Sequence, residues 1–384
     1  MIDTVPFDIL KDDLTGYDRQ HPAFVSFGET MIRDTPADNE RIERTRQVWV
    51  SLGGSELTVA VMLSRLGIPS TYITRIPDNP FGWMLRDIAQ GQGVNTDHLV
   101  WAEKNELMGR YLYELGRTPR AGIAWYQRKY SAASKLGTGM VDWENALKDA
   151  RLFHTSGITF GLSTHSGYDR NYLLEAYHEA LAARPGGCLV GMDFNYRSTL
   201  WSIEQCRQVM TPILKEKVDI LVTTLGDMAQ FYGLSCGNVT AETIGRDEFI
   251  RVEDADLHDF MQRLIEMFDI KVVALTFRYP DSHEQHRWES AAMDNQGHFH
   301  RSTSLWPIVL WDRLGGGDAW TGGFYYGLLT EEDPAKALQK GILVGDAATR
   351  LKQTLMYDLP ILSRQEVQAL MRADVLGGGK QTVR

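Results

Sequence analysis

One segment of the sequence combines glycines and a carboxylate in a pattern that could carry out chemistry. Asp312-Arg313-Leu314-Gly315-Gly316-Gly317-Asp318 leads into a stretch of helical character that continues to Leu329. Glycines that enter a helix leave backbone N–H groups bare at its positive end, which makes an anion site suited to phosphate or to a developing phosphoryl charge. Asp318, just inside the expected helix, could orient a substrate hydroxyl and accept its proton beside that site. A plain glycine-rich loop with an aspartate that caps a helix is the alternative.

The segments around this motif alternate between two kinds of pattern. Strand-like apolar runs are separated by helical patterns of 10 to 16 residues; the runs cover 24–29, 71–76, 152–155, 188–194, 219–223 and 272–277, and the helical patterns cover 57–66, 168–183, 203–215 and 256–268. Such alternation indicates βαβ units and a parallel sheet covered on both faces. We therefore predict an α/β fold, a three-layer α/β/α sandwich with a mainly parallel central sheet.

Two stretches break the alternation and predict a small lid. Residues 41–51 and 107–129 are β-prone, rich in Trp and Tyr, and lack intervening helices. We expect a small antiparallel sheet that projects from the main one. Its aromatic residues would be an aggregation hazard if left bare, so we expect a homodimer through the lids, although they could instead pack on the protein's own body. These residues are Trp49, Tyr111, Tyr113, Trp125 and Tyr126.

Composition and charge exclude several other classes of protein. The chain has 384 residues, of which 43% are hydrophobic and 23% charged, as in ordinary globular proteins. Its net charge of -10 is the wrong sign for a nucleic-acid partner. Three cysteines without CxxC spacing fit a reducing compartment, and we find neither a secretory signal nor 18 consecutive apolar residues. We expect a cytoplasmic protein that binds neither nucleic acid nor membrane.

Two widespread nucleotide-binding motifs do not occur in the sequence. We find no G-x-x-x-x-G-K-[ST] P-loop, which excludes a Walker-type ATPase. We also find no G-x-G-x-x-G after a predicted strand, which disfavours a nicotinamide dehydrogenase.

The glycine–aspartate segment resembles a signature of a known family. Asp312 to Asp318 is similar to the D-T-x-G-A-G-D motif of the ribokinase-like (PfkB) sugar kinases, with Arg313 for Thr and Gly316 for Ala. The segment Gly53-Gly54-Ser55-Glu56-Leu57-Thr58 resembles the family's other signature, a Gly-Gly pair that opens a helix, with Thr58 where Asn is usual. Two signatures in the right order are more specific than either alone.

The resemblance covers residues from about 24 to 371 and implies roles for both signatures. It implies a kinase with ATP and Mg²⁺ as cofactors, in which Asp318 is the base. The amides of Gly315, Gly316 and Gly317 would form the anion hole, and Gly53 and Gly54 would lie close to the sugar. The helix start should keep the pKa of Asp318 low, so that its carboxylate stays ionised well below neutral pH.

Further segments resemble the 2-keto-3-deoxygluconate kinases of this family. Residues 193–201 are close to their D-x-N-Y-R-x-x-L-W stretch, in which the arginine, here Arg197, meets the carboxylate of the sugar acid. A planar guanidinium is well suited to hold a carboxylate bidentately, although Arg197 could also form a structural ion pair. Residues 128–134 resemble their R-x-x-S-A-x-S turn, which makes Arg128 a substrate contact, and residues 351–354 match a late L-K-x-T element.

The sequence also departs from these relatives. Their Tyr-x-Arg pair on the lid corresponds to Tyr111 and Tyr113 in the expected register, so we assign these two to the substrate. Their N-x-x-E element is reduced to Thr224 and Asp227, where Asp227 could organise a hydrated Mg²⁺ through water. Their glycine-rich nucleotide loop is replaced by the segment that begins at Thr276. We assign Thr224, Asp227 and Thr276 to the nucleotide.

The sequence thus predicts one kinase domain and one leading reaction. The domain spans 21–373, with lid strands at about 30–52 and 105–130, an N-terminal extension at 1–20 and a tail at 374–384. We expect ATP-dependent phosphorylation of a keto-sugar acid, foremost 2-keto-3-deoxy-D-gluconate to its 6-phosphate. The alternatives are a kinase for another sugar, such as fructose or a deoxy-inositol-derived acid, and a catalytically silent sensor of sugar acids.

Overall fold

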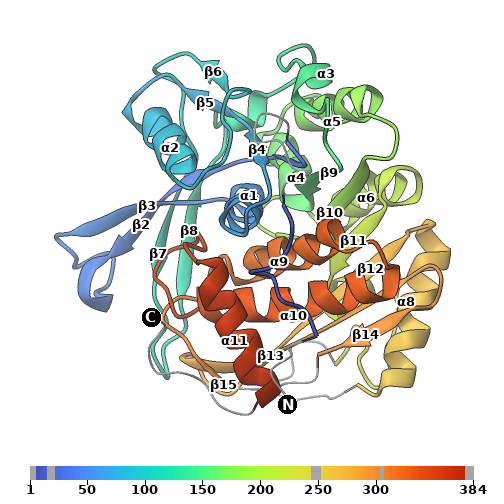
Figure 1. The fold of residues 1–384 in the computed structure, drawn as a ribbon. Coiled ribbons are helices and arrows are strands. Elements are labelled where there is room, and N and C mark those ends of the chain that lie inside the picture. Colours follow the sequence, from blue (N-terminus) through green and yellow to red (C-terminus); the bar gives the residue numbers. More distant parts are fainter. Residues whose placement is uncertain (1–5, 15–21, 244–251, 303–306, 377–384) are drawn as a thin grey trace.

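A twisted, mainly parallel sheet forms the centre of the molecule (Figure 1). The computed structural model describes residues 6–14, 22–243, 252–302 and 307–376. Within these residues the sheet has nine strands in the order β14-β13-β12-β11-β10-β9-β1-β4, with β15 paired to β13. Every pair from β4 to β12 is parallel, and β12 and β13 form an antiparallel hairpin. The strands are β1 (Phe24–Phe27), β4 (Ser70–Ile73), β9 (Leu152–Ser156), β10 (Leu189–Asp193), β11 (Ile220–Thr223), β12 (Val272–Pro280), β13 (Gln285–Asp294), β14 (Phe299–Arg301) and β15 (Pro307–Val309).

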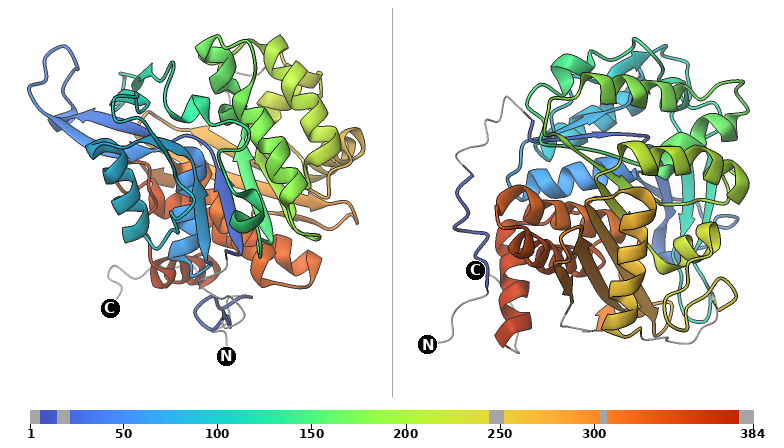
Figure 2. Two further views of the ribbon diagram at one scale, coloured as in Figure 1. Left: turned by 90° about the horizontal axis from the view of Figure 1, so that it is seen from above. Right: turned by 90° about the vertical axis from the view of Figure 1, so that its right-hand side faces the viewer.

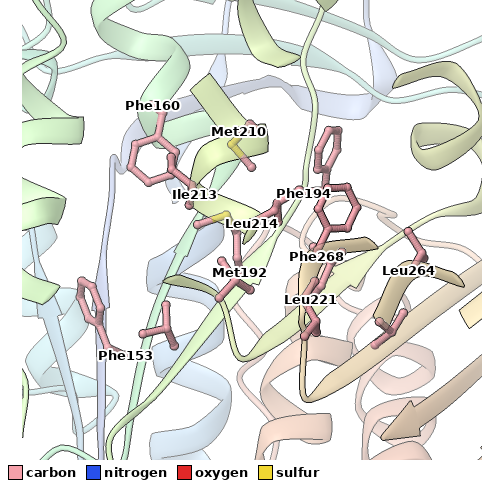
Figure 3. Close-up of a cluster of buried hydrophobic side chains, with 14 of the residues drawn as sticks. Phe153, Phe160, Met192, Phe194, Met210, Ile213, Leu214, Leu221, Leu264 and Phe268 are labelled. Carbon is pink, nitrogen blue, oxygen red and sulfur yellow. The ribbon is translucent and has the colours of Figure 1, made fainter. Parts of the chain in front are cut away.

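Helices cover both faces of this sheet, which confirms the predicted three-layer sandwich (Figure 2). One face packs on α3 (Trp143–Ala146), α4 (Gly157–Ser166), α5 (Tyr172–Ala183), α6 (Ile203–Lys217), α7 (Leu225–Tyr232) and α8 (Asp254–Phe268). The other face packs on α1 (Ser55–Arg65), α2 (Pro80–Gly91), α9 (Gly316–Thr330), α10 (Pro334–Lys352) and α11 (Arg364–Leu376). Figure 3 shows part of the first core, where Phe153, Met192 and Leu221 from the sheet meet Phe160 and Leu214 from the helices.

A four-stranded lid projects from the body, in the order β3-β2-β7-β8 (Figures 1 and 2). Its strands are β2 (Met31–Pro36), β3 (Val48–Gly53), β7 (Arg110–Glu114) and β8 (Ile123–Gln127). The expectation of a wholly antiparallel sheet was wrong, because β2 and β7 are parallel. Residues 41–47 are no strand either: this charged stretch belongs to the solvated connection between β2 and β3, which also contains the 3₁₀ turn Ala37–Asn39.

Smaller elements complete the described chain. A two-stranded sheet joins β5 (Arg75–Pro77) to β6 (Val100–Ala102), and a second 3₁₀ turn spans Ala133–Lys135. Residues 6–14 of the N-terminal extension dock on the body, where the Ile9 amide donates to Gln368 and Asp12 pairs with Lys340 at 3.0 Å. Across the described ranges, we find no helix with the length and apolar character needed to cross a membrane.

Candidate active site

Three chain segments that are far apart in the sequence meet at the start of α9. The Ser55 hydroxyl, in the first turn of α1, donates a hydrogen bond of 2.5 Å to Oδ1 of Asp318. The side-chain Nδ2 of Asn195, two residues after the end of β10, donates to the Ser55 hydroxyl oxygen at 3.3 Å. The two family-like signatures and the D-x-N-Y-R stretch therefore converge on the one carboxylate that the sequence predicted as a base.

The glycine turn at the start of α9, which consists of Gly315 to Gly317, is enclosed by close contacts on one side and open on the other. Gly315 has a φ of 75°, and a Cβ there would lie 2.2 Å from the backbone oxygen of Asp358, so only glycine fits. Gly316 packs on Gln353. Gly317 is exposed, and a Cβ at this position would have no neighbour within 4 Å. The expectation that all three glycine amides are bare was wrong for Gly316, whose N–H donates to the backbone oxygen of Arg313 at 3.3 Å. An anion can still approach the start of the helix from the side of Gly317, because the first N–H groups of a helix lack intrahelical partners.

The electrostatic environment of Asp318 differs from the sequence expectation. The side chain is half-buried, and the surrounding protein raises the pKa of its carboxyl above the usual value; the Ser55 hydroxyl and the Arg197 guanidinium oppose this shift. The expectation that the helix start keeps this pKa low was therefore wrong. Loss of hydration outweighs the favourable helix end at this position.

Two further carboxylates lie near the carboxyl ends of the neighbouring strands β10 and β11, the second of them in the first turn of α7. Asp193 ends β10, and its pKa is raised well above the usual value by burial and then by the charge of Asp318. Burial also raises the pKa of Asp227. Arg197 is exposed and lowers the pKa of both carboxyls, so its guanidinium lies within electrostatic reach of both and of Asp318.

The three residues assigned to the nucleotide lie on β12 and at the start of α7. Thr224 caps α7, where its oxygen accepts from the Asp227 amide at 3.1 Å and its hydroxyl donates to the Asp227 carboxylate at 2.9 Å. Thr276 lies on β12, half-buried and paired with Ser290 of β13. Because β12 continues to Pro280, a β-hairpin stands where a glycine-rich loop is usual. The nucleotide roles of these residues stay predictions.

Tyr111 and Tyr113 pack on the protein's own body, because a buried arginine lies beneath them. Arg33 of β2 is fully buried and bonds to Asp312 at 2.5 Å and to Asp358 at 2.7 Å. The Tyr111 hydroxyl donates to the same Asp358 at 2.7 Å, and the Tyr113 ring lies 4.8 Å from the Arg33 guanidinium. The exposed fraction is only 3% for Tyr111 and 4% for Tyr113. The expectation that both belong to a bare aromatic face was therefore wrong.

The Gly-Gly pair has a packing role of its own. A Cβ on Gly53 would lie 2.1 Å from the Tyr111 hydroxyl, and a Cβ on Gly54 would lie 2.7 Å from the backbone oxygen of Glu29. Gly53 therefore lets Tyr111 of β7 approach the end of β3, and Gly54 lets the connection between β1 and β2 pass close to the start of α1. Whether they also border the sugar stays a prediction.

Arg128 is buried in an ion pair that the sequence did not reveal. Its Nε donates to Glu29 at 2.8 Å, and the Ser131 hydroxyl donates to the other oxygen of that carboxylate. Arg128 also lies 5.9 Å from the ring of Tyr126, which stacks on Tyr111. The Tyr-x-Arg spacing that was expected at Tyr111 and Tyr113 thus occurs at Tyr126 and Arg128, where β8 ends.

The sequence did not indicate three further residues of this site, which are Ser55, Asn195 and Arg33. Ser55 stands inside a signature, but nothing in the spacing indicated that its hydroxyl faces Asp318. In the sequence, nothing distinguishes Arg33 from other residues of the predicted lid. Its two partners, Asp312 and Asp358, follow about three hundred residues later in the chain.

Comparison with known proteins identifies one family. The model of the pfkB family of carbohydrate kinases matches residues 22–246. A 2-dehydro-3-deoxygalactonokinase of Haloferax volcanii is 30% identical, and the alignment covers 92% of this chain and 98% of that protein. A 5-dehydro-2-deoxygluconokinase of Geobacillus kaustophilus is 24% identical, with coverage of 85% and 87%. The crystal structure of 2-dehydro-3-deoxygluconokinase from Thermotoga maritima superposes with a TM-score of 0.78 at 30% identity, with coverage of 91% and 98%.

Proposed function

The chain belongs to the pfkB family of carbohydrate kinases, and from that premise we propose that it phosphorylates a keto-sugar acid with ATP. The leading acceptor is 2-keto-3-deoxy-D-gluconate, which would become its 6-phosphate. One observation carries this proposal: a carboxylate, an open helix start and the exposed guanidinium of Arg197 lie together at one edge of the sheet. The first two suit phosphoryl transfer to a hydroxyl, and the third suits an acceptor that carries a carboxylate.

In the proposed reaction, Asp318 takes the proton of the sugar hydroxyl. The hydroxyl oxygen attacks the γ-phosphorus, and the bond from that phosphorus to the oxygen bridging it to the β-phosphorus breaks, which releases ADP. The N–H groups of Gly315 and Gly317 would stabilise the transferred group as charge develops on it, whereas that of Gly316 already donates to the backbone oxygen of Arg313. The hydrogen bond from Ser55 fixes one oxygen of Asp318 and leaves the other for the substrate.

Magnesium fits the carboxylates beside this centre. Asp193 and Asp227 are half-buried, and burial raises the pKa of both, so a nearby cation would stabilise their ionised forms. Mg²⁺ keeps several of its waters, so two carboxylates and the phosphates suffice to bind it. Asp227, through water, and Asp193 would hold the ion, which when bound would neutralise charge on the phosphates.

A second acceptor has its own support. The similarity to 5-dehydro-2-deoxygluconokinase makes the corresponding deoxygluconate acid a candidate. Both acids carry a carboxylate, so Arg197 serves either one, whereas fructose offers it no such partner. Arg128 and Tyr126 at the end of β8 would then help to distinguish between the acids through contacts with the rest of the sugar.

We expect Arg197→Ala to raise KM for the sugar acid about ten- to a hundredfold, because a charged hydrogen bond is worth roughly 1.5–3 kcal/mol. Steady-state kinetics with the acid as the varied substrate measures this effect. The matched control is Arg207→Ala, which removes an exposed arginine of α6 that pairs with Glu204 and should leave KM unchanged. An Arg197→Ala enzyme with the wild-type KM would refute the carboxylate contact.

We also propose that two chains associate through their lids. Trp125 is 62% exposed, and the strand register places it on the same lid face as Val50, which is 47% exposed. Light scattering at micromolar concentration should therefore give the mass of a dimer, and Trp125→Glu should give that of a monomer because a charge would enter the interface. A wild-type protein that is monomeric under these conditions would rule out the lid dimer.

A further inference from the structure

Two arginines beyond Arg197 stand beside the glycine turn without an acidic partner. Arg278 is exposed near the end of β12, and Arg313 is exposed immediately before Leu314 and the glycines. Within the described part of the chain, no ion pair joins Arg197, Arg278 or Arg313 to a carboxylate. The neighbouring Asp312 cannot neutralise Arg313, because its carboxylate is already bonded to Arg33 and to the Tyr357 amide.

Strand register shows which way Arg278 points. In the β12–β13 hairpin Arg278 pairs with Trp288 and Pro280 pairs with His286, so these residues share one face of the sheet. Trp288 belongs to the core on the side of α9 and α10. Arg278 therefore stands on the same face as α9 and its glycine turn.

The arginines also act on each other. Although part of the Arg278 side chain reaches solvent, the surrounding protein displaces some of its hydration and lowers its pKa, and the positive charges of Arg313 and Arg197 lower it further. Burial, and then the positive charges of Arg278 and Arg313, lower the pKa of His286 to about 4. Both guanidiniums therefore lie near this ring. Arg313 lines a small surface cavity together with Tyr113 and His283. Repulsion of this kind costs stability in the free protein, and a bound anion would relieve it.

We propose that Arg278 and Arg313 form a polyphosphate subsite on the donor side of the glycine turn. This proposal rests on the kinase function proposed above. The order of the sheet supports the donor over the sugar acid as the occupant: Arg278 extends β12, next to β11 and the Thr224–Asp227 segment, whereas Arg197 follows β10. Two planar guanidiniums can each bind phosphate oxygens bidentately. They add positive charge where the chain has a β-hairpin in place of a glycine-rich loop.

The test uses inorganic tripolyphosphate and ATP as probes in calorimetry. We expect Arg278→Gln and Arg313→Gln each to raise the Kd of both probes about ten- to a hundredfold, while the Kd for 2-keto-3-deoxygluconate changes less than about twofold. The matched control is Arg287→Gln, on the opposite face of the same hairpin and paired with Asp281 at 3.4 Å, which should bind both probes like wild type. Thermal melting confirms that each variant is folded.

The possible outcomes separate this proposal from the kinase function. If both variants bind tripolyphosphate and ATP as wild type does, the subsite is refuted while the kinase function stands. If instead they lose affinity for the sugar acid alone, the two arginines belong to the acceptor site and the assignment is overturned. A wild-type protein that binds no ATP at all would refute both.

Discussion

Replacing Asp318 with Asn is expected to lower kcat by about 10²–10⁴-fold, with ATP binding little changed. Asparagine keeps the shape of the side chain and can still accept from Ser55, but it cannot take the proton of the sugar hydroxyl. The loss corresponds to roughly 3–5 kcal/mol of barrier. Single-turnover kinetics and ATP titration of the folded variant measure the two quantities. Glu331→Gln, which removes a carboxylate at the far end of α9, serves as the control.

The pH dependence of kcat provides an independent test of the same base. Only ionised Asp318 can accept a proton, and burial raises the pKa of this carboxyl. Activity should therefore be full above that raised pKa and fall as the pH decreases through it, with a midpoint above the usual aspartate value of about 3.9. Asp318→Asn should abolish this acidic limb. Activity within a few-fold of wild type, with the limb intact, would show that another group is the base.

Arg33→Met is expected to destabilise the protein by about 3–5 kcal/mol, because it leaves two carboxylates without their buried cation. Asp312 and Asp358 both lose an ion pair, and the Tyr113 ring loses the guanidinium beneath it. Since Asp312 precedes the glycine turn, kcat should fall as well. Urea denaturation gives the free energy of unfolding. Adding Asp358→Asn should recover part of the loss, because it removes one of the orphaned charges.

Arg44→Met provides the comparison for this large effect. Arg44 lies in the connection between β2 and β3, and its side chain is 75% exposed and pairs with Glu40 at 3.8 Å. Loss of such a surface pair costs at most about 1 kcal/mol. If Arg33→Met were no more destabilising than Arg44→Met, the buried cluster would not hold the lid to the glycine turn.

The fold could be predicted from the sequence because its signals are local. Apolar runs, helical periodicity and glycine stops each report on a few neighbouring residues, and together they indicated the parallel sheet and the start of α9. The Arg33 cluster could not be predicted, since it joins residues 33, 312 and 358 through contacts that only the folded chain creates. The same holds for the burial of Tyr111, which alternation within its strand alone does not indicate. The raised pKa of Asp318 also depends on neighbours from α1 and from the segment after β10.

The most direct test of the central claim is a coupled kinase assay of the wild-type protein with ATP and Mg²⁺ across a panel of sugar acids and neutral sugars. We expect release of ADP with 2-keto-3-deoxy-D-gluconate, or with 5-dehydro-2-deoxygluconate as the second candidate, and only background release with ribose and fructose. Turnover of ribose or fructose at the rate of the best acid would contradict the proposed specificity for sugar acids. So would the absence of turnover with every sugar acid under conditions in which calorimetry shows that the acid binds.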